Sequence, residues 1–136
     1  MQLPSDLQHF PHLALIVLSD NGSSKLFLVG GESLEQLDGV SDPVEPLPDH
    51  EGSFEPGSHG VETDRFKHYA KMLAQHVTET VTAHNVTYIH LVMPPHIEHM
   101  VSADLPTTVK AKVMQGLHLD LMNEAPLDVV RRLLQD

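Results

Sequence analysis

The sequence predicts an α/β protein in which a single domain, residues 1–136, is built on a mixed five-stranded sheet with helices on both faces. Three apolar segments with strand character follow one another before residue 41, with no helix between them, and indicate an antiparallel meander. Two further strand segments each follow a helical stretch, as in the crossovers that add parallel strands to a sheet. With 136 residues, the chain is long enough for one hydrophobic core of its own.

The first two predicted strands form a hairpin. Residues 13–18 are a continuous apolar run with β-branched members, which is typical of a central strand covered on both faces. Residues 19–23 are dense in turn formers, and residues 25–29 return as the second strand. After the Gly30-Gly31 turn, a looser apolar pattern predicts a third strand over residues 33–40.

Residues 41–62 are predicted to form a long acidic loop, because prolines and glycines interrupt every apolar period there. A long helix follows, with Thr63 or Asp64 as its N-cap and residue 84 near its end. Asn85 suits the left-handed position that stops a helix. The buried stripe of this helix is marked by apolar residues at helical spacing: Phe66, Tyr69, Ala70, Leu73, Val77 and Val81.

Residues 86–136 predict a strand–helix–strand crossover. A strand over residues 86–93 ends at Pro94 and Pro95, and is followed by a helix over 96–103 and a second helix from Pro106. Residues 117–121 are predicted as the fifth strand, and residues 125–134 as the last helix. With the late strands parallel to the first, this order is that of ribonuclease-H-like folds. A flavodoxin-like fold is disfavoured, because no helices separate the first three strands.

Negative charge is concentrated in the first half of the chain. Residues 20–64 hold eleven acids against one base, which accounts for −10 of the net charge of −11. A nucleic-acid binder needs a basic face, so DNA is not an expected partner and tight RNA binding is disfavoured. The absence of cysteine excludes disulfides and thiolate metal sites. Neither a signal peptide nor a membrane span is predicted, so a soluble cytoplasmic protein is expected.

Three short motifs stand between residues 92 and 122. They are Met93-Pro94-Pro95 at a strand end, Lys110-Ala111-Lys112-Val113 in a helix, and Leu119-Asp120-Leu121-Met122 at a second strand end. Together with the opening hairpin, in which Asp20 follows the first strand, they resemble the bacterial host attachment protein family. That family is a bacterial branch of the archaeo-eukaryotic peptide-chain release factors, related to their middle domain. The resemblance implies a fold like that middle domain and a role near translation, with the ribosome or tRNA as partner.

The resemblance also directs attention to the loop before the long helix. Release factors carry Gly-Gly-Gln there, and the glutamine positions the water that hydrolyses peptidyl-tRNA. The matching loop, residues 48–60, is strongly acidic and has no glutamine and no adjacent pair of glycines. We therefore predict a binding domain without peptidyl-tRNA hydrolysis, more consistent with a non-enzyme than with an enzyme. The candidate binding residues of the loop are His50, Glu51, Gly52, Gly57, His59 and Gly60.

Eleven histidines leave a histidine-rich metal-binding protein open as an alternative. His96 and His99 lie three residues apart at the start of a predicted helix, where two imidazoles can reach one zinc or nickel ion. A third ligand is needed, and an exposed helical turn explains the pair without a metal. A hydrolase that uses the 48–60 loop is a further alternative.

Helical bases are the remaining candidates for contact with a partner. A modest basic patch for ribosomal RNA or an acidic partner is one interpretation of these residues, and ordinary solvated helix faces are the other. The bases are Arg65, Lys67, Lys71, Lys110 and Lys112. A nuclease is not predicted, because no cluster of three or four carboxylates converges at the strand ends.

Overall fold

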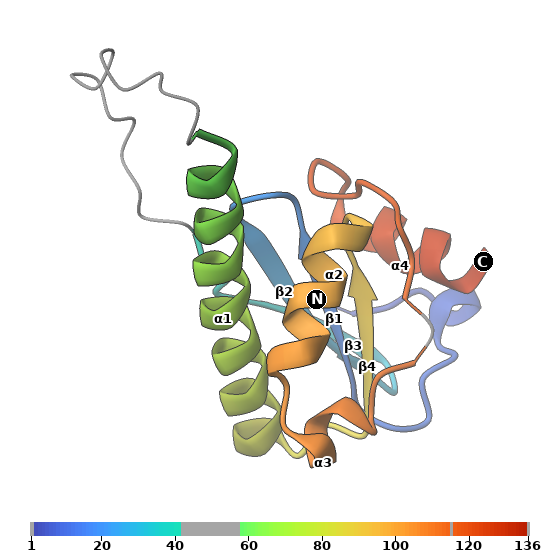
Figure 1. The fold of residues 1–136 in the computed structure, drawn as a ribbon. Helices are drawn as coiled ribbons and strands as arrows, with labels where there is room; N and C mark the ends of the chain where they lie inside the picture. Colours follow the sequence, from blue (N-terminus) through green and yellow to red (C-terminus); the bar gives the residue numbers. More distant parts are fainter. Residues whose placement is uncertain (1, 42–57, 115, 136) are drawn as a thin grey trace.

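The computed structural model describes residues 2–41, 58–114 and 116–135, with the backbone alone for residues 58–64 and 135. Within these ranges the chain forms an α/β fold with a mixed four-stranded sheet and four α-helices. Figure 1 shows α1 and α2 covering one face of the sheet, with α4 and the amino-terminal segment on the other. The prediction of helices on both faces is confirmed.

The strands of the sheet are β1 (Ala14–Ser19), β2 (Ser24–Gly30), β3 (Ser33–Leu37) and β4 (Tyr88–Val92). They lie in the order β3-β2-β1-β4. β2 is antiparallel to both β1 and β3, whereas β4 is parallel to β1. The predicted meander and the first parallel crossover are therefore both present, and β1 lies inside the sheet as its apolar run predicted.

The predicted fifth strand is wrong, because residues 117–121 form no regular strand. Val113 and Leu117 instead lie against the free edge of β4, in the isolated parallel bridges Ile89–Val113 and Val92–Leu117. The Met114 amide donates to the Ile89 carbonyl at 2.8 Å, and the Leu117 amide donates to the Leu91 carbonyl at 2.9 Å. The two donors are three positions apart in the chain, whereas their acceptors are only two positions apart. The two bridges therefore do not share one register and do not form a continuous ladder.

Alternate residues of the strands point to the two layers. Side chains of Leu15, Val17 and Leu91 pack with α1 (Ser58–His84) and α2 (Pro95–Asp104), which also contact one another. On the opposite face, Ile16 and Val92 pack with α4 (Pro126–Gln135) and with residues that flank the short 3-10 helix η1 (Ser5–Leu7). The remaining helix, α3 (Thr107–Lys110), follows α2 and buries Val109 in the first layer.

Two element boundaries differ from the prediction by three residues or more. α1 begins at Ser58, so Thr63 and Asp64 lie inside the helix and neither is its N-cap. β3 ends at Leu37 and not at residue 40, because the chain turns there to bond with Ser24. The Ser24 amide donates to the Val40 carbonyl at 2.9 Å, and Gly39 passes so close that a Cβ there would lie 1.9 Å from the Ser24 carbonyl oxygen.

The predicted end of α1 is confirmed. The helix ends at His84, and Asn85 adopts a φ of 55°, the left-handed conformation that stops a helix. None of the helices in the part of the chain that the structure describes is long and apolar enough to cross a membrane.

Candidate functional site

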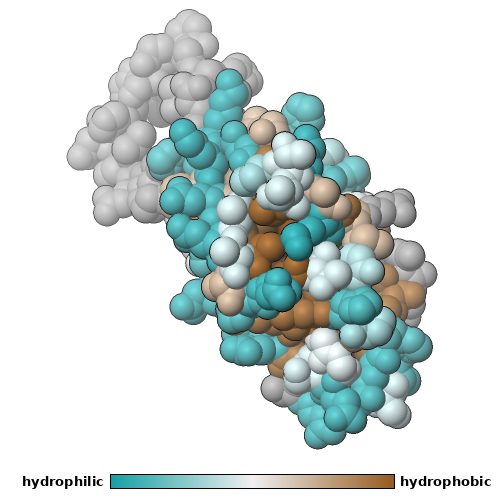
Figure 2. Space-filling model, turned by 90° about the horizontal axis from the view of Figure 1, so that it is seen from below, coloured by the Kyte–Doolittle hydropathy of each residue, from teal (hydrophilic) through white to brown (hydrophobic). Residues whose placement is uncertain are grey.

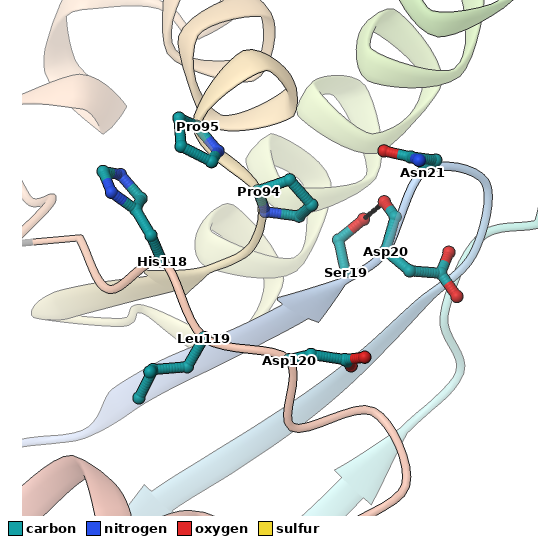
Figure 3. A pocket seen from close by; sticks show the side chains of 8 residues that line it. All are labelled: Ser19, Asp20, Asn21, Pro94, Pro95, His118, Leu119 and Asp120. Atoms are coloured by element: carbon teal, nitrogen blue, oxygen red, sulfur yellow. Dashed lines mark hydrogen bonds between the residues drawn. The ribbon is translucent and has the colours of Figure 1, made fainter.

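A cavity of about 350 Å³ opens at the end of the sheet where the parallel strands β1 and β4 finish. Ligands of open α/β sheets bind outside the carboxyl ends of the strands, so this is the edge at which a site is expected. Three chain segments form the walls (Figure 3). The lining residues are Ser19, Asp20, Asn21, Pro94, Pro95, His118, Leu119 and Asp120.

The first wall is the turn that joins β1 to β2. Asp20 organises it, since its Oδ1 accepts hydrogen bonds from the amides of Gly22 at 2.9 Å and Ser23 at 2.8 Å. An aspartate that bonds to the backbone two and three residues later is the usual way to fix such a turn. Ser19 is buried beneath it, and its Oγ lies 2.6 Å from the Tyr69 hydroxyl of α1. The turn is therefore fastened to the long helix.

The second wall is the Pro94-Pro95 step from β4 into α2. Pro95 occupies the first position of the helix, where the missing N–H costs nothing. His96 follows, and its Nε2 lies 2.7 Å from Asn21 Oδ1 on the first wall. The His96 ring also lies 5.3 Å, between centroids, from the Phe66 ring of α1. The contact with Asn21 joins the first two walls, and the contact with Phe66 joins the second wall to α1.

The third wall is the segment 118–120, which is held on both sides. His118 Nε2 lies 2.5 Å from Glu98 Oε1 of α2. Beyond the wall, Lys25 of β2 donates to the Met122 carbonyl at 2.5 Å, and the side chain of Met122 is buried. The Met122 amide donates to Asp120 Oδ1 at 3.3 Å. Each of the three walls of the cavity is thus held by hydrogen bonds to a neighbouring part of the protein.

The charge of the cavity is negative. Asp20 and Asp120 both contribute carboxylates, and the lining contains no lysine or arginine. The bonding partners found for these carboxylates are backbone amides and the Ser23 hydroxyl, which leave the charges uncompensated. The lining favours the binding of a cation or of a group rich in hydrogen-bond donors.

The described contacts of the cavity include no activated nucleophile. Ser19 is the candidate nucleophile in the lining, but its hydroxyl is buried and bonded to Tyr69 and to the carbonyls of Asp20 and Ser23. No general base contacts it among the hydrogen bonds of the described residues. The residues that the structure describes also contain no group of three or more histidines, aspartates or glutamates arranged to hold a metal.

One histidine with a shifted pKa lies away from this cavity. His90 of β4 is half-buried on the α4 face, and its ring lies 6.5 Å from that of Phe10. Burial removes water from the imidazole and lowers the pKa of His90 below its ordinary value of 6.5.

The loop residues predicted from the sequence lie mostly outside the described residues. This is true of His50, Glu51, Gly52 and Gly57, so the interpretation of that loop as a binding site or as a hydrolase site stays a prediction. His59 and Gly60 fall in the first turn of α1, where only the backbone is described. The acidic loop therefore leads directly into the long helix.

The predicted metal pair is placed on α2. His96 bonds Asn21 and contacts Phe66, whereas His99 is exposed. As in the rest of the described chain, no third ligand joins them in a group suited to a metal ion.

The five predicted bases fall into two groups. Arg65, Lys67 and Lys71 lie in the amino-terminal half of α1. Lys112 lies beyond the other end of that helix, where its Nζ donates to the Val86 carbonyl at 3.0 Å, and Lys110 is the last residue of α3. Between Arg65 and the end of α1 the helix rises by about 28 Å, at about 1.5 Å per residue. Lys71, in contrast, lines a hollow together with Asp104 and Pro106, next to the start of α3. The interpretation of the five bases as one patch stays a prediction.

Sequence reasoning missed the cavity itself. Asp20, the Pro94-Pro95 step and Asp120 were each placed at a strand end, but as separate features of the scaffold. The signal that could have joined them is the parallel relation of β1 and β4, which brings their carboxyl ends together. The contact of Glu98 with His118 gave no signal in the sequence, because it joins α2 to a segment twenty residues later that has no regular structure.

Comparison with known proteins gives a likeness of fold. No family model and no curated protein matches the chain. Among solved structures, an archaeal translation termination factor, aRF1, is similar with a TM-score of 0.60 and 9% identity, over 90% of this chain and 38% of that one. A second archaeal protein matches with a TM-score of 0.48 and 11% identity, over 90% of this chain and 37% of that one. The predicted likeness to release factors is confirmed as a likeness of fold, and the family stays a prediction.

Proposed function

We propose that this protein is a binding domain that associates with the ribosome or with tRNA in the cytoplasm and does not hydrolyse peptidyl-tRNA. The observation that carries the proposal is the fold, which resembles part of an archaeal translation termination factor over 90% of the chain. That factor is longer, and this chain corresponds to 38% of its length. The proposal therefore concerns the binding role of one domain.

The chemistry of the chain supports binding without hydrolysis. The 48–60 loop has no glutamine to position a water molecule, and its acids repel the RNA backbone that such a loop must approach. The cavity at the ends of β1 and β4 has no activated nucleophile among the described contacts. A domain with these properties would act by binding its partner and would not itself catalyse hydrolysis.

The amino-terminal half of α1 is the proposed contact surface for RNA. Lys67 and Lys71 are exposed and four residues apart, so they lie on one face of the helix. Arg65 is adjacent, and the segment that contains His50 to Gly57 precedes this end of the helix in the sequence. Phosphates are the groups that two or three such bases can bind.

The test uses the protein labelled at its amino terminus and titrated with ribosomes, with fluorescence anisotropy as the signal. The double variant Lys67→Gln/Lys71→Gln is expected to bind about tenfold more weakly than wild type, because two phosphate contacts are lost. The matched control Arg131→Gln/Arg132→Gln removes the same charge from α4 and is expected to leave the affinity unchanged. Equal losses in the two variants would contradict the assignment of the surface.

A further inference from the structure

The cavity at the carboxyl ends of β1 and β4 has a shape, a rim and a charge that the proposed function does not use. We propose that it binds the guanidinium group of an arginine side chain presented by a partner protein. This inference rests on the cavity alone and holds whether or not the ribosome is the assembly that the protein joins.

The first argument is that the cavity is already formed. Its three walls are tied together by Asn21 with His96, at 2.7 Å, and by Glu98 with His118, at 2.5 Å. The turn that carries Asp20 is anchored to α1 through the buried Ser19–Tyr69 contact. A ligand entering such a site has little ordering of the protein to overcome, which favours binding.

The second argument is the kind of hydrogen-bonding groups that remain. In Figure 3, Asp120 extends from the third wall toward the turn that bears Asp20, whereas His118 lies at the Pro95 side. The Met122 amide uses one oxygen of Asp120. At Asp20 the Gly22 and Ser23 amides use Oδ1, and the Ser23 hydroxyl lies within hydrogen-bond distance of both oxygens, at 3.1 and 3.2 Å. The second oxygen of Asp120 and the remaining lone pairs of the Asp20 carboxylate are acceptors that carry negative charge. They require a ligand that donates several hydrogen bonds and carries positive charge.

The third argument is the match with arginine in size and surface. A volume of about 350 Å³ is at the small end of ligand pockets and suits a side chain better than a larger cofactor. The guanidinium group is planar, is only weakly hydrated and has five donors in a fixed fork. Its flat face can lie on the rings of Pro94 and Pro95 while its edge meets the carboxylates. A phosphate-bearing ligand is excluded here by the same two carboxylates, and the described residues provide no three-ligand group for a metal.

The test is a titration of the ¹⁵N-labelled protein with the blocked tripeptide Ac-Gly-Arg-Gly-NH2, followed by amide chemical shifts. Saturable shifts are expected at Asn21, His118, Leu119 and Asp120. The same peptide with citrulline in place of arginine has nearly the same shape without the charge. It is expected to bind at least tenfold more weakly, which corresponds to about 1.4 kcal/mol.

Matched variants separate this site from general attraction to an acidic protein. Asp120→Asn and Asp20→Asn remove one charge each, and asparagine can still accept the bonds that fix each segment. Each is expected to weaken the arginine peptide about fivefold or more, whereas Glu35→Gln, an exposed acid on β3, is expected to leave the affinity unchanged. Equal binding of the citrulline peptide, or equal losses in all three variants, would overturn the proposal. Shifts spread evenly over the acidic surface would overturn it as well.

Discussion

Ser19 and Tyr69 lie fifty residues apart in the chain, yet their hydroxyl oxygens are 2.6 Å apart and both side chains are buried. Ser19 ends β1 and Tyr69 faces it from α1, so this contact joins the central strand to the long helix at the rim of the cavity. Ser19 Oγ also donates to the carbonyls of the turn. The same few atoms therefore secure the layer of helices and the first wall of the site.

Removal of the Tyr69 hydroxyl is expected to destabilise the protein. Tyr69→Phe leaves the Ser19 hydroxyl buried without this partner, which costs about 1–2 kcal/mol of unfolding free energy. That loss lowers Tm by about 3–8 °C in a chain of this size. Thermal unfolding followed by circular dichroism measures it. The chain contains only one other tyrosine, Tyr88, which is 38% exposed, and Tyr88→Phe is the control expected to change Tm little.

Stability is expected to fall as the pH is lowered below 6.5, in part because of His90. Burial lowers the pKa of His90 in the folded protein, so the unfolded chain takes up the proton first. The contribution of the neutral imidazole is complete above the unfolded pKa of 6.5 and is lost as the pH falls toward the folded pKa. Urea unfolding at pH 7.5 and pH 5.5 is expected to show a smaller loss for His90→Gln than for wild type. The exposed His84→Gln is the control, and an equal loss in both variants would refute the role of His90.

Gly116 is expected to control the contact that holds the third wall. A Cβ at this position would lie 2.2 Å from Glu98 Oε2, so the carboxylate must move away from His118 to admit it. Because the His118 side chain of this pair is 52% exposed and water screens the contact, the cost of Gly116→Ala is expected to be modest, about 0.5–1 kcal/mol. In the Glu98→Ala background the same substitution is expected to cost less. Additive effects in a double-mutant cycle would show that the two residues are not coupled.

Asn85 offers a test of the end of α1. Alanine at a φ of 55° is strained by about 1 kcal/mol, whereas glycine adopts this conformation readily. Asn85→Ala is therefore expected to lower the unfolding free energy, and Asn85→Gly to leave it nearly unchanged. Asn123 is also exposed but has no positive φ, so Asn123→Ala is a suitable control. Denaturant titration compares the three variants.

Most of the fold could be predicted because its signals are local. The apolar run of β1, the helical spacing of Tyr69, Leu73 and Val77, and the stop at Asn85 each lie within a few residues of the chain. The predicted fifth strand failed because Val113 and Leu117 meet the edge of β4 only through isolated bridges that do not share one register. Such a register is set by contacts between distant segments, here Glu98 against Gly116. It therefore cannot be predicted from the sequence of one segment alone.

The site was predictable only in part. Asp20 and Asp120 stood out as acids after apolar segments, yet a hundred residues separate them in the chain. Their convergence depends on the parallel pairing of β1 with β4 and on Lys25 reaching the Met122 carbonyl. The predicted loop site, in contrast, was chosen by resemblance to release factors, and residues His50 to Gly57 lie outside the described structure.

The central claim is that this domain binds ribosomes without releasing peptide, and one reaction measures both quantities. Ribosomes carrying peptidyl-tRNA with a labelled peptide are mixed with the protein and sedimented, and the pelleted protein and the freed peptide are counted. We expect saturable pelleting with a dissociation constant of about 10 µM or tighter, and release no faster than without protein. Protein that stays in the supernatant at every ribosome concentration, or peptide freed in proportion to bound protein, would contradict the account.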